Sequence, residues 1–360
     1  MKIGIITFHF AHNYGAMLQT FALQETLKGM GHEAFIVDYA PEYHTIWFKR
    51  SITWRSCITK SPKATWIRIK NKIRNSKNVR ERYDNFEFFK ATKMNLYPYD
   101  PKDDMSGFDA VILGSDQIWN ENLTNHRFDG PYYGDGIVCK VFSYAASTTY
   151  QSLTKRQEDL FREKLSKMAA IGVRERQLQK ILQPLTKKPV VLNLDPTLLC
   201  DVDVYSTLCS GNPLDRNYVL VYELSPHKEV LEMAKRYAKR YGLTVMTLVG
   251  HIQYYMREGY DLTASPADFV SYFKNADCIF TTSFHGTAFS ILFRKKFYAI
   301  KQNDMRDGRI LSLLSQLNLT NQFIEMESIP NNCEIDYESV QPLLTNLIEQ
   351  SKTYIKNSLS

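Results

Sequence analysis

Short apolar, β-prone runs alternate with segments of helical periodicity along most of this chain, and no other feature limits the fold as much. The apolar run at residues 2–8 is followed by a helical stripe that contains Ala16, Leu23 and Met30. Residues 33–39 then have the composition of a second strand. Because a helix between two strands returns the chain to the edge where the first strand began, such strands pair in parallel. The sequence therefore predicts an α/β fold with parallel sheets.

The alternation occurs in two halves, which are separated by the turn-rich segment CSGNPLDRN at residues 209–217. We predict two Rossmann-like domains that face each other across a central cleft, with ligands at the carboxyl ends of the strands. The expected bounds are 1–200 for the N-terminal domain, 201–335 for the C-terminal domain on the donor side, and 336–360 for a C-terminal helix. We expect helices at about residues 154–168, 228–241, 307–317 and 337–354.

Composition excludes several classes of protein. The 360 residues are 44% hydrophobic, which is typical of globular domains, and no apolar run approaches the ~20 residues that a membrane-spanning helix needs. Residues 1–8 read as a first strand and not as a signal peptide, so we expect a cytoplasmic protein. The six cysteines have neither CxxC nor histidine-paired spacing. We therefore expect no disulfide framework, no metal and no cofactor.

The positive charge of the chain is concentrated in one insertion at about residues 47–93. This segment contains 14 lysines and arginines and three acidic residues, which gives it a net charge of +11. The whole chain carries +7, so the remainder carries −4, the difference between the two values. The basicity is thus a property of the insertion and not of the fold.

Two interpretations give the insertion a partner, and a third makes it a solvated helix. Basic residues beside large apolar ones resemble an interfacial segment that contacts an anionic membrane surface; the residues that carry this pattern are Trp66, Ile67, Ile69, Lys70, Lys72 and Arg74. Trp47, Trp54 and Trp66 interleaved with basic residues would also suit nucleic acid. We expect no nucleic-acid partner, because the rest of the chain is net acidic and has no reader motif.

The segment TTSFHGTAFSILF, at residues 281–293, places His285 between a buried strand and a helix. Backbone N–H groups at a helix start favour an anion, and a histidine beside that anion can transfer protons. The sequence predicts an anion-binding site there, with His285 as the proton-transfer residue and with Ser283, Gly286 and Thr287 around the anion. The alternative is a polar turn residue that bonds to a carbonyl.

Two arginines stand where a strand passes into a helix. Arg174, in GVRERQLQKIL, opposes the helix dipole, whereas its neighbour Glu175 suits it. Arg174 should therefore be held by a carboxylate or phosphate, either from a ligand or in an interdomain salt bridge. Arg309 opens an apolar helix and is a second candidate for the donor site; a solvated position is the alternative.

Two further turns supply candidates for acceptor binding. HNYG lacks the second and third glycines of a dinucleotide fingerprint, yet Asn13 and Gly15 could approach a ligand closely. In GSDQIWN, Asp116 follows a strand, and Trp119 would offer a flat face to a sugar ring. Helix capping by Asn13 or Asp116 and core packing of Trp119 are the alternatives.

Taken in order, several motifs resemble those of the polysaccharide pyruvyl transferase family. The resemblance runs from residue 2 to about residue 317, and the motifs that carry it are HNYGAMLQTFALQ, GSDQIWN, SYAAST, VRER, LDPTLL and TTSFHGTAFSILF. It implies a GT-B-like arrangement of two Rossmann-like domains. It also implies transfer of a pyruvyl group from phosphoenolpyruvate to a saccharide, as a ketal, with release of phosphate.

The resemblance also assigns residues. His285 matches the histidine placed at the donor, and Arg174 matches the arginine that contacts the donor's anionic groups. We therefore expect His285 and Arg174 to be catalytic, and the donor-binding residues to be Ser283, Gly286, Thr287 and Arg309. Many members carry arginine where this chain has Ser283, so one cation of the donor clamp is missing here. Acceptors in such pathways are often carried on membrane lipids, which would bring the enzyme to the inner face of the cell membrane. A GT-B glycosyltransferase that uses a nucleotide sugar is the main alternative, and a basic nucleic-acid-binding protein is the third.

Overall fold

The computed structural model describes the whole chain except residues 46–57, 59–60, 210–216, 226, 251–259 and 327–333. The first sheet has five parallel strands in the order β3-β2-β1-β4-β5. The bounds of these strands are Lys2–Ile6 (β1), Glu33–Val37 (β2), Leu96–Tyr97 (β3), Ala110–Leu113 (β4) and Lys140–Ser143 (β5). All four residues of β4 are buried, because helices cover a parallel sheet on both faces.

A short two-stranded sheet extends this layer beyond β5. It pairs β6 (Ile171–Val173) with β7 (Val190–Leu192). Ala146 forms parallel bridges to Asp116 on one side and to Val173 on the other. The chain segments that follow β4, β5 and β6 therefore lie next to one another.

The helices of this half are α1 to α6 and several short 3-10 turns. Their bounds are Tyr14–Gly29 (α1), Glu42–Thr45 (α2), Pro62–Lys93 (α3), Lys155–Lys167 (α4), Arg176–Leu182 (α5) and Val202–Ser206 (α6), with turns at Gly130–Tyr133, Gln183–Leu185 and Pro196–Leu198. Helix α4 begins with a capping box in which Thr154 and Gln157 bond each other's backbone N–H groups.

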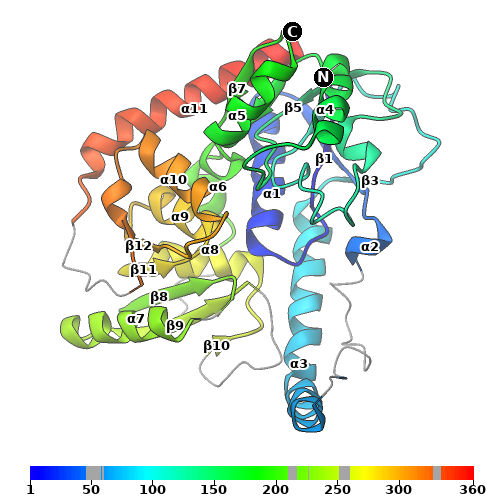
Figure 1. Cartoon of the computed structure of the whole chain (residues 1–360). Coiled ribbons are helices and arrows are strands. Elements are labelled where there is room, and N and C mark those ends of the chain that lie inside the picture. The colour runs from blue at the N-terminus through cyan, green and yellow to red at the C-terminus, as the bar shows by residue number, and fades with distance from the viewer. Residues whose placement is uncertain (46–57, 59–60, 210–216, 226, 251–259, 327–333) are drawn as a thin grey trace.

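The second sheet has six parallel strands in the order β10-β9-β8-β11-β12-β13. Its strands are Tyr218–Glu223 (β8), Thr244–Val249 (β9), Tyr260–Asp261 (β10), Cys278–Thr281 (β11), Lys296–Ile300 (β12) and Phe323–Ile324 (β13). Its helices are Lys228–Tyr241 (α7), Pro266–Asn275 (α8), Phe284–Leu292 (α9) and Asp307–Gln316 (α10), with a 3-10 turn at Thr320–Gln322. The predicted fold class is confirmed: two Rossmann-like domains in a GT-B-like arrangement (Figure 1).

The strand order creates a switch point in each sheet. In the first, the chain leaves β1 toward β2 on one side and reaches β4 on the other. In the second, β8 has the same position between β9 and β11. Ligands of open parallel sheets bind at such points, beyond the carboxyl ends of the strands. We therefore expect a ligand-binding site at the segments that follow β1, β4 and β11.

The last helix, α11 (Tyr337–Leu359), joins the two halves. Near its start, the hydroxyl of Tyr337 donates a 2.6 Å hydrogen bond to the carbonyl of Lys295, beside β12. Near its end, the hydroxyl of Tyr354 donates a 2.7 Å bond to the carbonyl of Ser143, in β5. The chain thus returns to the first sheet, as Figure 1 shows.

Helix α3 is the second connection between the halves, and it contains most of the described part of the basic insertion. The guanidinium of Arg82 is buried and donates to the hydroxyl of Tyr14 (2.7 Å) and to the carbonyl of Gly250 (2.8 Å), which follows β9. The amide of Asn85 donates to the carbonyl of Thr263 at 2.8 Å. Trp47 and Trp54 lie outside the described residues.

Neither a membrane-spanning helix nor a group of three or more metal-ligating side chains occurs among the described residues. Sequence periodicity located the helices well: α7 has the predicted bounds, α4 is one residue shorter than predicted at each end, and α10 is one residue shorter at its C-terminal end. Helix α11 is longer than predicted, since it continues five residues beyond Tyr354.

Replacement of Tyr354 by phenylalanine should weaken the return of α11 to the first sheet. The substitution removes one buried hydrogen bond and leaves the Ser143 carbonyl without that donor, so we expect a loss of about 1–3 kcal/mol in the free energy of unfolding. Urea denaturation measures this loss. Thr353→Ala, on the exposed face of the same helix, is the control and should change stability by less than about 0.5 kcal/mol. Equal stability of the two variants would contradict the contact.

Candidate active site

His285 is the second residue of α9, directly after β11. The helix is capped by Ser283, whose hydroxyl accepts a hydrogen bond from the Gly286 N–H at 3.4 Å. The first intrahelical bond runs from the Thr287 N–H to the Ser283 carbonyl at 3.0 Å. His285 itself is only 7% exposed. The end of β11 therefore delivers the imidazole into the interface with the first domain.

The imidazole of His285 lies against the start of α1. A Cβ atom on Gly15 would stand 2.0 Å from Nδ1 of His285 and 2.4 Å from its Cγ, distances that no side chain tolerates. Asn13 caps α1 by accepting from the N–H groups of Gly15 (2.9 Å) and Ala16 (3.2 Å). Gly15 thus provides the space that His285 occupies, and Asn13 has the capping role that the sequence left open.

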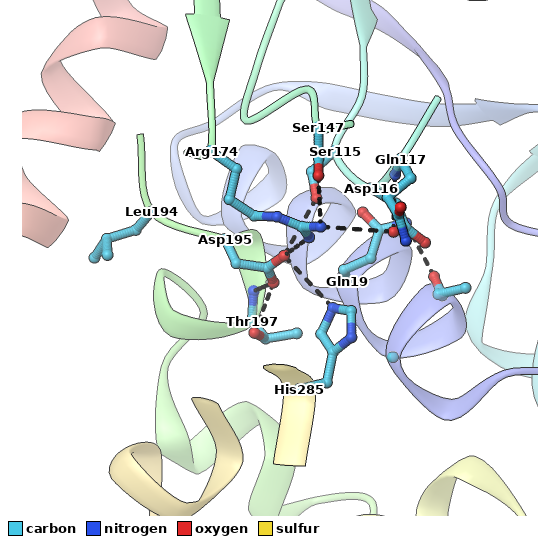
Figure 2. A network of polar contacts seen from close by, with 12 residues as sticks. Gln19, Ser115, Asp116, Gln117, Ser147, Arg174, Leu194, Asp195, Thr197 and His285 are labelled. Carbon is cyan, nitrogen blue, oxygen red and sulfur yellow. Dashed lines mark hydrogen bonds and ion pairs between the residues drawn. The ribbon is translucent and has the colours of Figure 1, made fainter. Parts of the chain in front are cut away.

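Asp195 lies beside the other nitrogen of the imidazole, which forms no hydrogen bond among the described residues. Its Oδ2 lies 3.5 Å from Nε2 of His285, as Figure 2 shows. Its Oδ1 accepts from the backbone N–H (3.0 Å) and the hydroxyl (2.7 Å) of Thr197, which fixes the carboxylate. Burial alone would raise the pKa of Asp195, but His285 and Arg174 hold that pKa well below its usual range. Asp195 is therefore a buried, charged partner for His285.

Arg174 is surrounded by acceptors from its own domain (Figure 2). Its Nη1 donates to Asp195 at 2.6 Å, its Nε to Glu175 at 3.1 Å, and its Nη2 to the hydroxyl of Ser147 at 3.0 Å. The same Nη2 lies 3.7 Å from a carboxylate oxygen of Asp116. Burial lowers the pKa of Arg174, but these carboxylates raise it above its ordinary value, so the guanidinium is permanently charged.

The partner that the sequence required for Arg174 is thus supplied by protein carboxylates of the same domain. The contact across the domains is made by the face of the guanidinium, which lies 4.6 Å from the centroid of the Phe284 ring at the start of α9. The three nitrogens of Arg174 are already used in this structure. Arg174 therefore holds Asp195 and α9 in place, and little of its hydrogen-bonding capacity faces a ligand.

Arg309 is a buried cation of a different kind. It lies in the first turn of α10 and is 8% exposed. Its Nε has no hydrogen-bond partner in the described part of the chain, and its side chain forms no ion pair there. Burial and then the charge of Arg174 lower its pKa, while Glu175 acts in the opposite direction, which places Arg309 close to both. A guanidinium keeps its proton even so, and an unpaired buried charge is costly. Arg309 is therefore available to an anion.

Three predicted donor residues are used for packing in α9. A Cβ on Gly286 would lie 2.1 Å from the hydroxyl of Thr281, so this glycine lets α9 approach β11 and leaves no room there for a ligand. The hydroxyl of Thr287 donates to the Ser283 carbonyl at 3.1 Å. Ser283 is 3% exposed and serves as the helix cap. These side chains shape the start of α9 and do not themselves project into the interface.

The two residues predicted from GSDQIWN separate in the structure. Asp116 stays at the site, beside Arg174, with a left-handed backbone conformation (φ 71°). Trp119 is 0% exposed, and its Nε1 donates to the carbonyl of Tyr132 at 3.0 Å. The sugar-stacking interpretation of Trp119 is wrong, because no face of the ring reaches the surface; core packing, the alternative, describes it.

Sequence reasoning missed three of the acceptors that surround Arg174. It assigned no site role to Asp195, Glu175 or Ser147, although each follows a strand, and Asp195 precedes a proline in LDPTLL. An acidic residue between a buried strand and Pro196 caps the following turn, which was the available signal. What the sequence could not show is that these three residues converge on Arg174.

Comparison with models of protein families places the chain in one of them. The model of the polysaccharide pyruvyl transferase family matches residues 13–304, which is most of the chain and includes every residue of the site except Arg309.

This chain belongs to the polysaccharide pyruvyl transferase family.

Two of the solved structures that resemble this chain do so at low sequence identity. UDP-N-acetylglucosamine 2-epimerase from Rickettsia bellii shares 11% identity, with a TM-score of 0.40, over 98% of this chain and 97% of its own. ADP-heptose lipopolysaccharide heptosyltransferase II from E. coli shares 11% identity, with a TM-score of 0.36, over 98% and 100%. No curated protein matches this chain in sequence.

Gly15→Ala should disturb His285 directly. The added methyl group would overlap the imidazole, and such overpacking typically costs about 1–3 kcal/mol of stability. We expect a lower free energy of unfolding and shifted ring resonances of His285 in NMR spectra. Gly29→Ala, at the other end of α1, meets nothing within 4 Å and should leave both unchanged or raise stability slightly. Unshifted His285 resonances in Gly15→Ala would show that the ring does not pack there.

Proposed function

We propose that this protein transfers a pyruvyl group from phosphoenolpyruvate to a saccharide, a cell-surface polysaccharide or its precursor, forming a pyruvate ketal and releasing phosphate. Family membership supports a transferase acting on polysaccharide. The observations that carry the finer proposal are the imidazole of His285, which lies 3.5 Å from the Asp195 carboxylate, and the buried guanidinium of Arg309, whose Nε has no hydrogen-bond partner among the described residues. A donor with a carboxylate and a phosphate needs both features: a cation for its charge and a group that moves protons.

Arg309 and the start of α9 would bind the anionic groups of the donor. The N–H groups of Phe284 and His285 precede the first intrahelical donor of α9, and the helix dipole favours negative charge at this end. Many family members carry an arginine at the position of Ser283. In this chain, Arg309 supplies a cation near the same helix start, and we propose that it takes over part of that role.

Arg174 would act as a positioning residue. Because its guanidinium binds Asp195, Glu175 and Ser147, it fixes the carboxylate that faces Nε2 of His285. In this proposal, the donor contacts Arg309 directly, and the charge of Arg174 attracts the donor without a direct contact. Removal of Arg174 would leave Asp195 and Glu175 buried without their cation, which typically costs about 3–5 kcal/mol.

His285 would carry the proton transfers of the reaction. Ketal formation adds a proton to the methylene carbon of the enol, bonds a saccharide oxygen to the neighbouring carbon, and removes the hydroxyl proton. A second hydroxyl then replaces phosphate on that carbon, so one proton and the phosphate leave. Nε2 lies beside Asp195, and Nδ1 lies beside Gly15 at the start of α1, where the acceptor would enter. A histidine held this way can give a proton in one step and take one in another.

The acceptor would enter from the first domain. Asp116 is the predicted acceptor residue that remains at the site, and Asn13 and Gly15 form the adjoining turn at the start of α1. A carboxylate beside the switch point of the first sheet can accept hydrogen bonds from sugar hydroxyls. An acceptor carried by a lipid is part of the proposal, and with it peripheral contact of a cytoplasmic enzyme with the inner face of the cell membrane.

Replacement of Arg309 by glutamine should weaken donor binding. The loss of a charge-assisted contact typically costs about 1.5–3 kcal/mol, which is roughly ten- to over a hundredfold in affinity. Calorimetric titration with phosphoenolpyruvate measures the effect. Arg306→Gln, which removes a half-buried cation three residues earlier that pairs with Asp304, is the control and should bind almost normally. If UDP or GDP raises the melting temperature while phosphoenolpyruvate does not, the enzyme is instead a nucleotide-sugar glycosyltransferase.

His285→Gln should give a folded protein that binds the donor and turns over at least about a hundredfold more slowly. Glutamine keeps the size and a hydrogen bond but cannot move protons, and general acid–base roles are worth ~10²–10⁴ in rate. Phosphate release from phosphoenolpyruvate, measured with a panel of lipid-linked and nucleotide-linked sugars, tests this. The exposed His126→Gln variant should keep the normal rate. Near-normal phosphate release by the His285→Gln variant would contradict the assignment of His285 as the catalytic residue.

A further inference from the structure

The amino-terminal half of α3 has an exposed face on which basic and apolar side chains alternate. Residues 62–80 contain seven lysines and arginines and no acidic residue. Positions spaced by three and four share one face of a helix. On α3 these positions form an exposed stripe, which we call the α3 stripe, made of Lys63, Trp66, Lys70, Ile73, Lys77 and Arg80.

The apolar members of the α3 stripe are open to solvent. Trp66 is 65% exposed and Ile73 is 62% exposed, and Ile67 at the edge of the stripe is 45% exposed. The Nζ of Lys70 lies 5.8 Å from the centroid of the Trp66 ring, so a basic and an aromatic member already contact each other. Large apolar side chains gathered on one exposed face mark a contact surface.

The opposite face of α3 attaches the helix to the rest of the protein. Asn75 and Arg82 are buried, as are Phe86 and Phe89 farther along the helix. Figure 1 shows that the helix extends beyond the two domains. The α3 stripe therefore does not pack on the described part of this chain, and the fold itself does not explain it.

We propose that the α3 stripe docks this enzyme onto the anionic surface of a phospholipid bilayer. Lysines and arginines would lie among the phosphate groups, tryptophan would lie at the level of the headgroups, and isoleucine would reach the boundary of the acyl chains. Charge complementarity selects anionic lipid, because seven basic residues stand in a segment without a single carboxylate.

Other occupants fit the α3 stripe less well. A second copy of the helix would bring two rows of like charge together, which opposes association. Nucleic acid would neutralise the lysines and could stack on Trp66, but it would leave Ile67 and Ile73 in water. A bilayer surface satisfies both kinds of side chain. A bilayer surface can also contact the whole α3 stripe, because the stripe runs along one helix.

Docking through α3 would also fix the position of the active site. Trp66 and Arg82 are sixteen residues apart, which is about 24 Å along a helix axis. At Arg82, the same helix bonds to Tyr14 in α1 and to Gly250 in the second domain. Tyr14 precedes Gly15, which contacts His285. The stripe would therefore hold the interface between the domains near the bilayer, where a lipid-carried acceptor would be found. This consequence rests on the proposed function, whereas binding of the α3 stripe to the bilayer does not.

Vesicle flotation with the full-length protein tests the proposal. We expect binding to vesicles of phosphatidylcholine mixed with phosphatidylglycerol at low salt, weaker binding at high salt, and little binding to phosphatidylcholine alone. The variant with Lys63→Glu, Lys70→Glu and Lys77→Glu should lose about a hundredfold or more in partitioning. The matched control makes the same change of charge at exposed lysines elsewhere, with Lys102→Glu, Lys187→Glu and Lys239→Glu, and should keep most of its binding.

Further measurements separate the outcomes. Trp66→Ala should reduce partitioning several-fold without a change of charge, because an apolar anchor is lost. Absence of binding to anionic vesicles at low salt, equal loss in the two triple variants, or preferential binding to an oligonucleotide or an acidic protein would overturn the proposal. Phosphate release with a soluble saccharide should be unchanged in the α3 triple variant. If no variant releases phosphate, the proposed reaction fails while the vesicle result stands.

Discussion

The buried guanidinium of Arg174 is the interaction on which the site depends. Its carboxylate partners follow different strands: Asp116 follows β4, Glu175 follows β6, and Asp195 follows β7. Buried carboxylates so close together would repel one another, and burial alone raises the pKa of Glu175, which Arg174 opposes. One permanent cation therefore lets three strand ends meet. Through the ring of Phe284, the same cation also joins the first domain to α9.

The sequence predicted those features that arise within a single element. Helix α7 has the bounds that its apolar stripe indicated, because hydrophobic periodicity is a local property that burial enforces directly. The parallel pairing of both sheets followed from the alternation of strands and helices in the same way. His285, Arg174 and Asp116 could be placed at the carboxyl ends of strands for this reason. Their partners depend on how separate strand ends pack together, and no spacing along the chain encodes that packing.

Glycine and tryptophan show why residue type alone could not settle the remaining roles. Gly15 and Gly286 both stand at helix starts, but one gives space to the imidazole of His285 and the other to the hydroxyl of Thr281. Only the first bears on the chemistry. Trp119 has the composition of a sugar platform and lies in the core, where its ring stacks 5.9 Å from that of Tyr133. In each case the neighbour determines the role, and the neighbour is distant in sequence.

The balance of charge at the site limits how an anionic donor could enter. Three carboxylates and two guanidinium groups lie together there, so an added phosphate and carboxylate meet a surplus of negative charge. The surplus falls when a proton is taken up. Burial raises the pKa of Glu175, whereas His285 and Arg174 hold the pKa of Asp195 below its usual range. Protonation of Glu175 and binding of an anionic donor would then favour each other, since each reduces the cost of the other.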